Sequence, residues 1–195
     1  TGAEPVRAVI PAAGHAREPS LETVLRGRPV AMLDIHGKSV LERHVDLLNS
    51  LGVKDISVVT GHAADTIDVD GIQKIHNHDF ESTHVLDSIM AAQAELAGRV
   101  LVLYSDVIVE KAVLERLLAC DDDIVLVVDS SYRETARRLD KVEEGQAVLV
   151  TATQPLREGR RVIRSGRLTA VARIGKRLDP RHAHFEFVGV AMFSP

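Results

Sequence analysis

Short apolar runs of strand length alternate with amphipathic helical patterns along much of the chain, and this alternation constrains the fold more than any other feature. It is typical of βαβ units, in which parallel strands form one sheet and the connecting helices cover it. The predicted strands are residues 7–10, 56–60, 72–75, 100–104 and 124–129. We therefore expect an α/β fold with a mainly parallel sheet.

One helix between the first two strands has clear signals at both ends. Ser39 stands at the N-cap position with Glu42 at the reciprocal position of a capping box, and Gly52 marks the end of the helix. Its predicted buried stripe consists of Leu41, Val45, Leu48 and Leu51.

Further helices are predicted over residues 85–96 and 111–118, both packed on the sheet. The apolar side of the first of them consists of Leu86, Ile89, Met90 and Leu96. After about residue 141 the pattern changes to two short strands within 161–174, around a Ser165-Gly166 turn, and another strand over 185–193. This predicts a small antiparallel extension.

The chain length and composition fit one folded domain. At 195 residues with 45% hydrophobic residues, the chain can bury a single core, so we expect one domain over residues 1–195. The apolar strand 185–193 is followed only by Ser194 and Pro195. We therefore expect the domain to be truncated at its C-terminus.

Charge, hydropathy and cysteine content exclude several classes of partner. A net charge of −4 and a pI near 6.1 argue against nucleic-acid binding, which needs a basic face. No apolar run approaches the roughly 20 residues that span a bilayer, so no membrane association is expected. Cys120 is the only cysteine, which favours a reducing compartment and a cytoplasmic location.

Small residues directly follow the first predicted strand. Ala12, Ala13 and Gly14 leave room for a ligand to approach the main chain, whose N–H groups can hold an anion. A basic loop follows, with Arg17, Arg26 and Arg28. A small-residue turn alone is a weak signal, but with these arginines it predicts a phosphate site.

The ligand is expected at the carboxyl ends of the strands, where open α/β sheets bind their ligands. The residues at those positions are 11–14, 61–62, 76–77, 105–106 and 129–130. They include two carboxylates, Asp106 and Asp129, that could hold a hard cation. This combination predicts a nucleotide with magnesium.

Each acidic candidate also has a simpler interpretation. Asp106 could cap the helix that begins near Glu110, although its place after a central strand favours a metal role. Asp129 adjoins two serines, so turn formation is as good an interpretation as ligand contact. The run of aspartates at 121–123 is interpreted as a solvated turn.

Histidine pairs could suggest zinc, because residues two apart share one face of a strand. The pairs are His76 with His78 and His182 with His184. Without neighbouring cysteines or further ligands, we do not predict a zinc site.

Several segments resemble the nucleotidyltransferases of the nucleotide-diphospho-sugar transferase fold, and the resemblance spans nearly the whole chain. They are AAGHAR, RGRPVAMLDIHGKSVLERHVDLLNSLGVKDISVVTGH and LVLYSD. The segments THVLDSIMAA, ARIGKRL and FEFVGVAMFS are most similar to phosphocholine and phosphonate cytidylyltransferases, some of which are fused to phosphoenolpyruvate mutase. The resemblance implies a Rossmann-like, three-layer α/β/α fold with a mostly parallel sheet.

The resemblance also implies an activity. Such enzymes move a nucleotidyl group from a nucleoside triphosphate to a phosphate or phosphonate oxygen, release pyrophosphate and use Mg²⁺. Here we expect CMP transfer from CTP. By resemblance, Asp106 ligates Mg²⁺, Arg17 faces the triphosphate and Lys176 approaches the phosphates. The implied nucleotide-binding residues are Ala12, Ala13, Gly14, Arg28, Gly61 and Ser88.

Two positions depart from the family pattern. Ala16 stands where a glycine is expected, and Val30 stands where the family has a lysine after the proline. Arg26 or Arg28 could supply the missing cation. The Val30 departure keeps open a catalytically inactive nucleotide-binding module with a regulatory or assembly role.

The acceptor and the oligomeric state are less constrained by the sequence. A sugar-1-phosphate nucleotidyltransferase also fits, because acceptor choice depends on side chains whose placement the sequence does not give. A nicotinamide dehydrogenase is disfavoured, since no G-x-G-x-x-G turn follows the first strand. A homodimer is an option, because the strand 185–193 could pair with another subunit.

Overall fold

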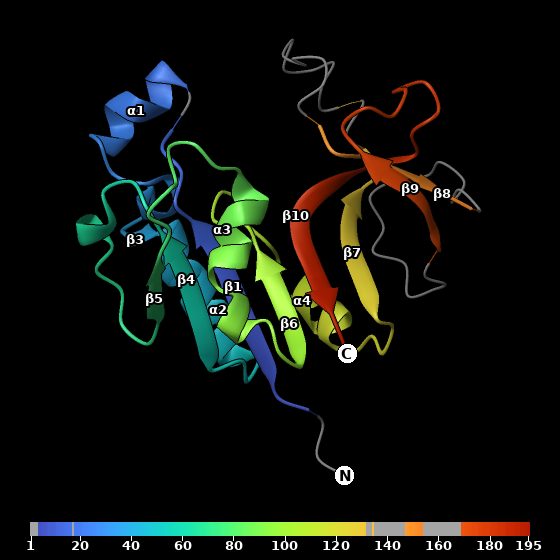
Figure 1. The fold of residues 1–195 in the computed structure, drawn as a ribbon, viewed down its shortest axis with the longest axis horizontal. Helices are drawn as coiled ribbons and strands as arrows, with labels where there is room; N and C mark the ends of the chain where they lie inside the picture. The colour runs from blue at the N-terminus through green and yellow to red at the C-terminus, as the bar shows by residue number, and fades with distance from the viewer. Residues whose placement is uncertain (1–3, 17, 132–133, 135–146, 154–168) are drawn as a thin grey trace. The chain divides into compact units, whose positions relative to one another are not determined.

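The computed structural model describes residues 4–16, 18–131, 134, 147–153 and 169–195. The chain divides into two compact units, Thr1–Val125 with Gly189–Pro195, and Leu126–Val188 (Figure 1). Each unit contains a cluster of buried hydrophobic side chains.

The first unit is built on a mostly parallel sheet. Its parallel strands are β1 (Val6–Ala12), β4 (Asp55–Thr60), β5 (Gln73–His76) and β6 (Arg99–Leu103). They lie in the order β5-β4-β1-β6, and each neighbouring pair is parallel. The last part of β10 (Phe185–Phe193) pairs antiparallel with β6, with Val190 opposite Leu103. The predicted parallel sheet is confirmed for four of the five predicted strands, whereas the fifth, residues 124–129, pairs with β10 instead.

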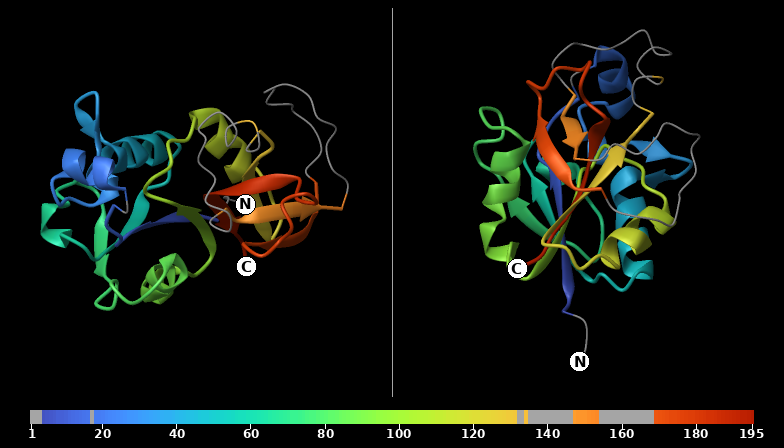
Figure 2. Two further views of the ribbon diagram at one scale, coloured as in Figure 1. Left: turned by 90° about the horizontal axis from the view of Figure 1, so that it is seen from above. Right: turned by 90° about the vertical axis from the view of Figure 1, so that its right-hand side faces the viewer.

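Helices cover both faces of this sheet, with α3 on one side and α2 and α4 on the other (Figure 2). The helical elements of the first unit are α1 (Pro19–Leu25), η1 (Val30–Met32), α2 (Val40–Ser50), η2 (Ala64–Thr66), α3 (Val85–Ala91), η3 (Gln93–Glu95) and α4 (Lys111–Leu118). A small hairpin of β2 (Asp34–Ile35) and β3 (Lys38–Ser39) precedes α2. No helix in the described residues is both long and apolar enough to cross a bilayer.

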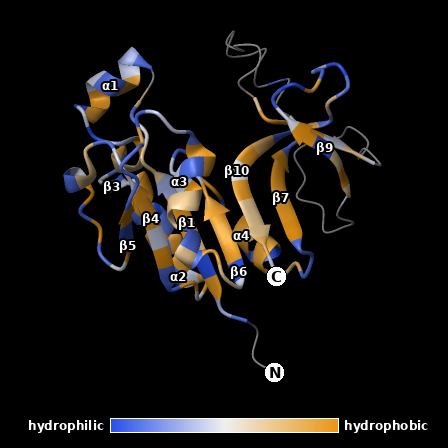
Figure 3. Ribbon diagram, in the orientation of Figure 1, coloured by the Kyte–Doolittle hydropathy of each residue, from blue (hydrophilic) through white to orange (hydrophobic). Residues whose placement is uncertain are grey.

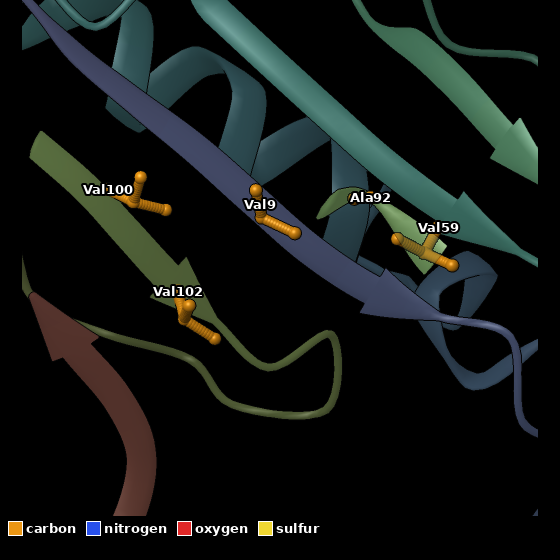
Figure 4. Close-up of a cluster of buried hydrophobic side chains, with 5 residues drawn as sticks. All are labelled: Val9, Val59, Ala92, Val100 and Val102. Atoms are coloured by element: carbon orange, nitrogen blue, oxygen red, sulfur yellow. The ribbon is translucent and has the colours of Figure 1, made fainter. Parts of the chain in front are cut away.

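The core of the first unit lies on the two faces of the sheet. On the α3 face, Val9, Val59, Val100 and Val102 pack with Ala92 (Figure 4). Alternate residues of β1 point to the opposite face, because strand side chains have a period of two. β1 is therefore buried on both sides, and Figure 3 shows the apolar residues concentrated along the central strands.

The helix α2 forms as its capping signals predict. Ser39 Oγ accepts a hydrogen bond from the Glu42 N–H at 3.1 Å, and the Ser39 N–H donates to Glu42 Oε2 at 2.7 Å. This reciprocal pair satisfies donors that the first helical turn leaves without a partner. The predicted stripe is confirmed, with Leu41, Val45 and Leu48 buried and Leu51 half-buried.

The predicted apolar side of α3 is wrong at two positions. Leu86 is 65% exposed and Met90 is 47% exposed, whereas Ser88 and Ala92 are buried. The helix ends at Ala91 and continues as a short 3-10 turn, so residues 88 and 92, one turn apart, face the sheet. Ser88 tolerates that inner position because its hydroxyl oxygen accepts a hydrogen bond from the buried amide of Asn77.

The second unit is antiparallel. Its strands are β7 (Ile124–Asp129), β8 (Leu149–Ala152), β9 (Val171–Gly175) and the first part of β10. β8 pairs antiparallel with β9 and with Phe185 and Glu186 of β10, and β7 pairs with β10. Val150, Ala152 and Phe185 form a small core. The predicted antiparallel extension is confirmed, while the turn at 165–166 lies outside the described residues.

Candidate active site

The turn after β1 is built against the end of β4. Ala12 and Ala13 are buried, and the Ala13 carbonyl accepts a hydrogen bond from the His62 N–H at 2.9 Å. A Cβ atom on Gly61 would lie 2.8 Å from that carbonyl oxygen and 2.7 Å from Cβ of Phe80. Only glycine fits at this position. Gly14, in contrast, is exposed and has open space around it.

A basic turn is attached to this edge through one imidazole ring. Arg26 and Gly27 both have left-handed backbone conformations, with φ of 54° and 80°. His62 Nε2 lies 2.9 Å from the Gly27 carbonyl oxygen and therefore donates to it. The guanidinium of Arg28 follows, anchored by its Nε, which donates to the Leu25 carbonyl at 3.2 Å.

His62 thus joins two predicted parts of the phosphate site. Its main chain contacts Ala13 in the small-residue turn, and its side chain contacts Gly27 in the basic turn. Among the hydrogen bonds within the described residues, Arg28 uses only its Nε, so its two terminal nitrogens remain for an anion. The structure therefore places Arg28 on a turn that His62 links to Ala13.

Ser88 is linked to the same edge of the sheet by a hydrogen bond from the buried side-chain amide of Asn77. Asn77, directly after β5, donates from Nδ2 to Ser88 Oγ at 3.2 Å and to Thr83 Oγ1 at 3.0 Å. Its own N–H donates to the Thr60 carbonyl at 2.8 Å. Ser88 is buried, with its oxygen accepting from Asn77 and its hydroxyl proton available for a further partner.

Aromatic rings lie beside Gly61. The His62 ring has its centroid 6.4 Å from that of Phe80 and 5.8 Å from that of His15. Phe80 also packs directly over Gly61. The turn that carries the small residues is therefore flanked by rings as well as by main-chain groups.

Asp106 follows β6, which is parallel to β1 and next to it (Figure 1). Its side chain is exposed, and no hydrogen bond or ion pair within the described residues engages its carboxylate. The helix α4 begins with Glu110 at its N-cap, so the interpretation of Asp106 as a helix cap is wrong. The carboxylate is free to meet a ligand at the edge shared by β1 and β6.

The described residues fit a Mg²⁺ ion that arrives with the substrate. The described part of the chain holds no group of three or more histidine, cysteine, aspartate or glutamate side chains that could hold a metal ion. Mg²⁺ commonly binds to one or two carboxylates and completes its shell with water and substrate phosphates. Asp106 therefore suits a Mg²⁺ ion that arrives with a triphosphate, rather than a permanently held metal.

Three other residues are candidates from the sequence. Lys176 is exposed and belongs to the second unit, directly after β9. Arg17 lies outside the described residues. Asp129 is engaged in a turn, where its Oδ1 accepts from the N–H and the hydroxyl of Ser131, both at 2.7 Å. The turn interpretation of Asp129 is confirmed.

The remaining polar clusters are the aspartates at 121–123 and the histidine pairs. Residues 121–123 are exposed, as a solvated turn requires. His76 and His78 are in ring contact at 4.7 Å, while His182 pairs with Asp179 and His184 accepts from the Ala152 N–H. The described residues give no set of zinc ligands.

The two departures from the family pattern are at positions 16 and 30. Ala16 is buried. Val30 is half-buried as the first residue of η1, directly after the buried Pro29. Val30 is apolar and carries no charge. In the described residues, the positive charge next to it in sequence belongs to Arg26 and Arg28.

Sequence reasoning missed His44, and it placed His62 and Asn77 at the ligand edge without predicting their contacts. His44 had a usable signal, because it lies three residues after Leu41 and four before Leu48, on the buried stripe of α2. His62 and Asn77 each lie just beyond a strand, but their hydrogen bonds depend on which strands are neighbours. A single sequence does not give that pairing.

Comparisons with known proteins identify the family of the chain. The family model of the MobA-like NTP transferase domain matches residues 8–180. The chain is 32% identical over 145 residues to the CMP-5'-(3-aminopropyl)phosphonate synthase of Streptomyces rubellomurinus. The match covers 69% of this chain and 22% of that protein, so the chain spans under a quarter of the length of this relative.

Solved structures share the fold at low sequence identity. The inositol-1-phosphate CTP transferase of T. maritima aligns with a TM-score of 0.68 at 16% identity, over 99% of this chain and 71% of its own. The CTP:phosphocholine cytidylyltransferase of Streptococcus pneumoniae aligns with a TM-score of 0.52 at 17% identity, over 98% and 72%. These neighbours show the fold, and the extent of the family match shows that the chain belongs to the MobA-like NTP transferase domain family.

Proposed function

We propose that this chain transfers CMP from CTP to an oxygen of a small phosphonate or phosphate, with release of pyrophosphate. The observation that carries the proposal is the double contact of His62, which joins the Ala13 turn to the basic turn at Gly27. It assembles main-chain groups and arginine at the edge of the sheet where Asp106 also stands. The similarity to a CMP-phosphonate synthase supports CTP as donor and a phosphonate as acceptor.

The reaction needs this arrangement because both reactants are anions. An acceptor oxygen attacks the α-phosphorus of CTP, the bond from that phosphorus to the oxygen bridging toward the β-phosphorus breaks, and pyrophosphate leaves. The protein must offset the repulsion and hold the two groups in line. No covalent bond to the enzyme is formed.

Each part of the site has a role in the proposal. Main-chain groups of residues 12–14 hold the phosphates, and Arg28 supplies the positive charge that Val30 lacks. Gly61 and Ser88 lie at the edge that would receive the nucleoside. Arg17 and Lys176 are proposed as further cations for the triphosphate, from their positions in the sequence alone.

Asp106 is proposed to hold Mg²⁺. When bound, this ion would neutralise phosphate charge and orient the triphosphate. The exposed and unengaged carboxylate of Asp106 suits this role, because a ligand to a substrate-borne ion has to remain accessible.

The test is a pyrophosphate-release assay with CTP, UTP, GTP or ATP as donor. The acceptors are 3-aminopropylphosphonate, 2-aminoethylphosphonate, phosphocholine and glucose 1-phosphate, each with Mg²⁺. We expect release with CTP and a phosphonate or phosphocholine. Turnover with glucose 1-phosphate alone would instead favour a sugar-1-phosphate nucleotidyltransferase.

The first variant to test is Asp106→Asn, which keeps the side-chain size and removes the charge. We expect kcat to fall by about 100-fold or more, equivalent to roughly 2.7 kcal/mol of lost transition-state stabilisation. Asp122→Asn, in the exposed turn at 121–123, is the matched control and should keep wild-type activity. Full activity of Asp106→Asn at limiting Mg²⁺ would show that the metal assignment is wrong.

A second candidate function is a nucleotide-binding module without catalysis, favoured by the apolar Val30 at the position of the family lysine. The two candidates differ in turnover. Binding of CTP measured by calorimetry, without pyrophosphate release for any acceptor in the panel, would support the module.

A further inference from the structure

A histidine is buried on the helix α2 and bonded to the segment that carries Asp106. His44 is 2% exposed, and its Nε2 lies 2.6 Å from the carbonyl oxygen of Val107. The two residues are 63 positions apart in the sequence. Since a carbonyl only accepts, His44 carries its proton on Nε2 and donates it to Val107.

This hydrogen bond fixes the peptide next to Asp106. After β6 ends, the Tyr104 N–H donates to the Gly189 carbonyl at 2.9 Å, and the Val107 N–H approaches the Tyr104 carbonyl at 3.4 Å. The Asp106 carboxylate itself has no partner within the described residues, so its position follows from this turn. Tyr104 and His44 hold the turn at its two ends.

Packing alone does not account for a histidine here. The other ring nitrogen, Nδ1, is buried with no hydrogen-bond partner among the described residues. A buried polar atom without a partner is unfavourable, and leucine at this stripe position would avoid it. Burial lowers the pKa of His44, against the opposing effects of the Val107 carbonyl and the Asp106 charge, which fits a neutral ring that donates from Nε2.

We propose that His44 is a positioning residue, which sets the place of the Asp106 carboxylate by holding the carbonyl of Val107. This inference rests on the proposed function, in which Asp106 holds Mg²⁺. In this inference His44 affects the metal-dependent step through the Asp106 turn and contacts neither the nucleotide nor the metal. A misplaced carboxylate would lower kcat and weaken the use of Mg²⁺, while the affinity for the nucleotide base stays unchanged.

The test compares His44→Leu, which fills the space without the hydrogen bond, with His44→Gln, whose amide can still donate. Val45→Ala is the control, because Val45 is buried in the same helix and its apolar side chain makes no hydrogen bond to the turn. For His44→Leu we expect kcat to fall about 10- to 100-fold and the half-saturating Mg²⁺ concentration to rise. The KM for CTP at saturating Mg²⁺ should stay within about 2-fold, because no nucleotide contact is lost.

His44→Gln should recover most of the activity, and Val45→Ala should lower stability without changing kcat or the Mg²⁺ dependence. If the role of His44 is purely structural, all three variants should lose stability and none should change the response to Mg²⁺. That result would overturn the proposal.

Amide hydrogen exchange tests the same inference without an activity assay. Peptides covering residues 104–110 should exchange faster in His44→Leu than in wild type, and not in Val45→Ala. Unchanged exchange in His44→Leu would overturn the inference. If His44→Leu fails to fold, His44→Gln is tested in its place. Unchanged exchange in His44→Gln together with full loss of activity would then overturn the inference. If wild type shows no pyrophosphate release, the proposed function fails, and the exchange experiment still decides whether His44 holds the Asp106 turn.

Discussion

Gly61 and Gly14 stand at neighbouring turns of the candidate site, but their surroundings constrain them differently. A Cβ atom at position 61 would meet Phe80 at 2.7 Å and the Ala13 carbonyl at 2.8 Å, and the carbonyl belongs to the main chain and cannot move away easily. At position 14 nothing lies within 4 Å. We expect Gly61→Ala to lower the free energy of unfolding by about 1–3 kcal/mol, measured by urea denaturation.

Gly14→Ala serves as the matched variant and should leave the free energy of unfolding nearly unchanged. If phosphates approach the main chain at this turn, the same variant should weaken CTP binding. Equal stability of the two variants would contradict the packing described around Gly61.

The residues of the site could be predicted to different degrees. Ala12 to Gly14 and Asp106 were predicted from residue type and position relative to a strand, and their roles stay predictions. The role of His62 could not be predicted, since its contacts to Ala13 and Gly27 require knowing that β4 lies beside β1 and that the basic turn folds back toward both. Lys176 and Arg17 were identified through resemblance, and their roles stay predictions.

At the scale of one element, the capping box of α2 gives a stability prediction. Ser39→Ala removes the acceptor of the Glu42 N–H and should cost about 1 kcal/mol. Ser50→Ala, at the exposed opposite end of the helix, is the control, because Ser50 bonds only to the Leu47 carbonyl in the described structure. Thermal denaturation of both variants measures the difference.

The same box predicts a pH dependence. Hydrogen bonds from the side chain and main chain of Ser39 hold the pKa of Glu42 below its ordinary value. The stabilisation is therefore present above the ordinary pKa and is lost as the pH falls through the lowered one. The cost of Ser39→Ala should be larger at neutral pH than in acid. A cost that stays constant across that range would show that Glu42 does not contribute.

Elements with strong local signals could be predicted, and those that depend on packing could not. The strand 124–129 and the helix 111–118 have the predicted bounds. Asp123 and Ser130 flank the strand, and Glu110 marks the start of the helix. Helix α1 was missed, since seven residues with an exposed Val24 carry little periodic signal. The exposed Leu86 and Met90 were assigned to the core because periodicity does not show where α3 stops.

At the scale of the whole molecule, ligand binding should stabilise the fold. A ligand that binds only the folded state at 100 times its Kd adds about 2.7 kcal/mol, which raises the Tm of a chain this size by roughly 5–10 °C. We expect this shift with CTP and Mg²⁺ in differential scanning fluorimetry. The shift should be smaller for CTP with EDTA and smaller for ATP with Mg²⁺.

The comparison of donors also tests base preference without an acceptor. Equal shifts for CTP and ATP would contradict a cytidine-specific site, and the absence of any shift would contradict nucleotide binding by the described fold. Asp106→Asn should keep part of the CTP shift and lose its dependence on Mg²⁺.

If phosphates bind at the turn of Ala12 to Gly14, they meet main-chain groups rather than side chains, because Ala12 and Ala13 are buried and Ala13 is held by His62. Recognition by peptide groups does not depend on which side chain a mutation installs elsewhere. Selection for a new donor or acceptor would therefore leave this turn intact and accumulate its changes in the surrounding side chains, such as Phe80 and Arg28. In a laboratory evolution experiment, few replacements at residues 12–14 and many in the surrounding side chains would indicate that main-chain groups bind the phosphates.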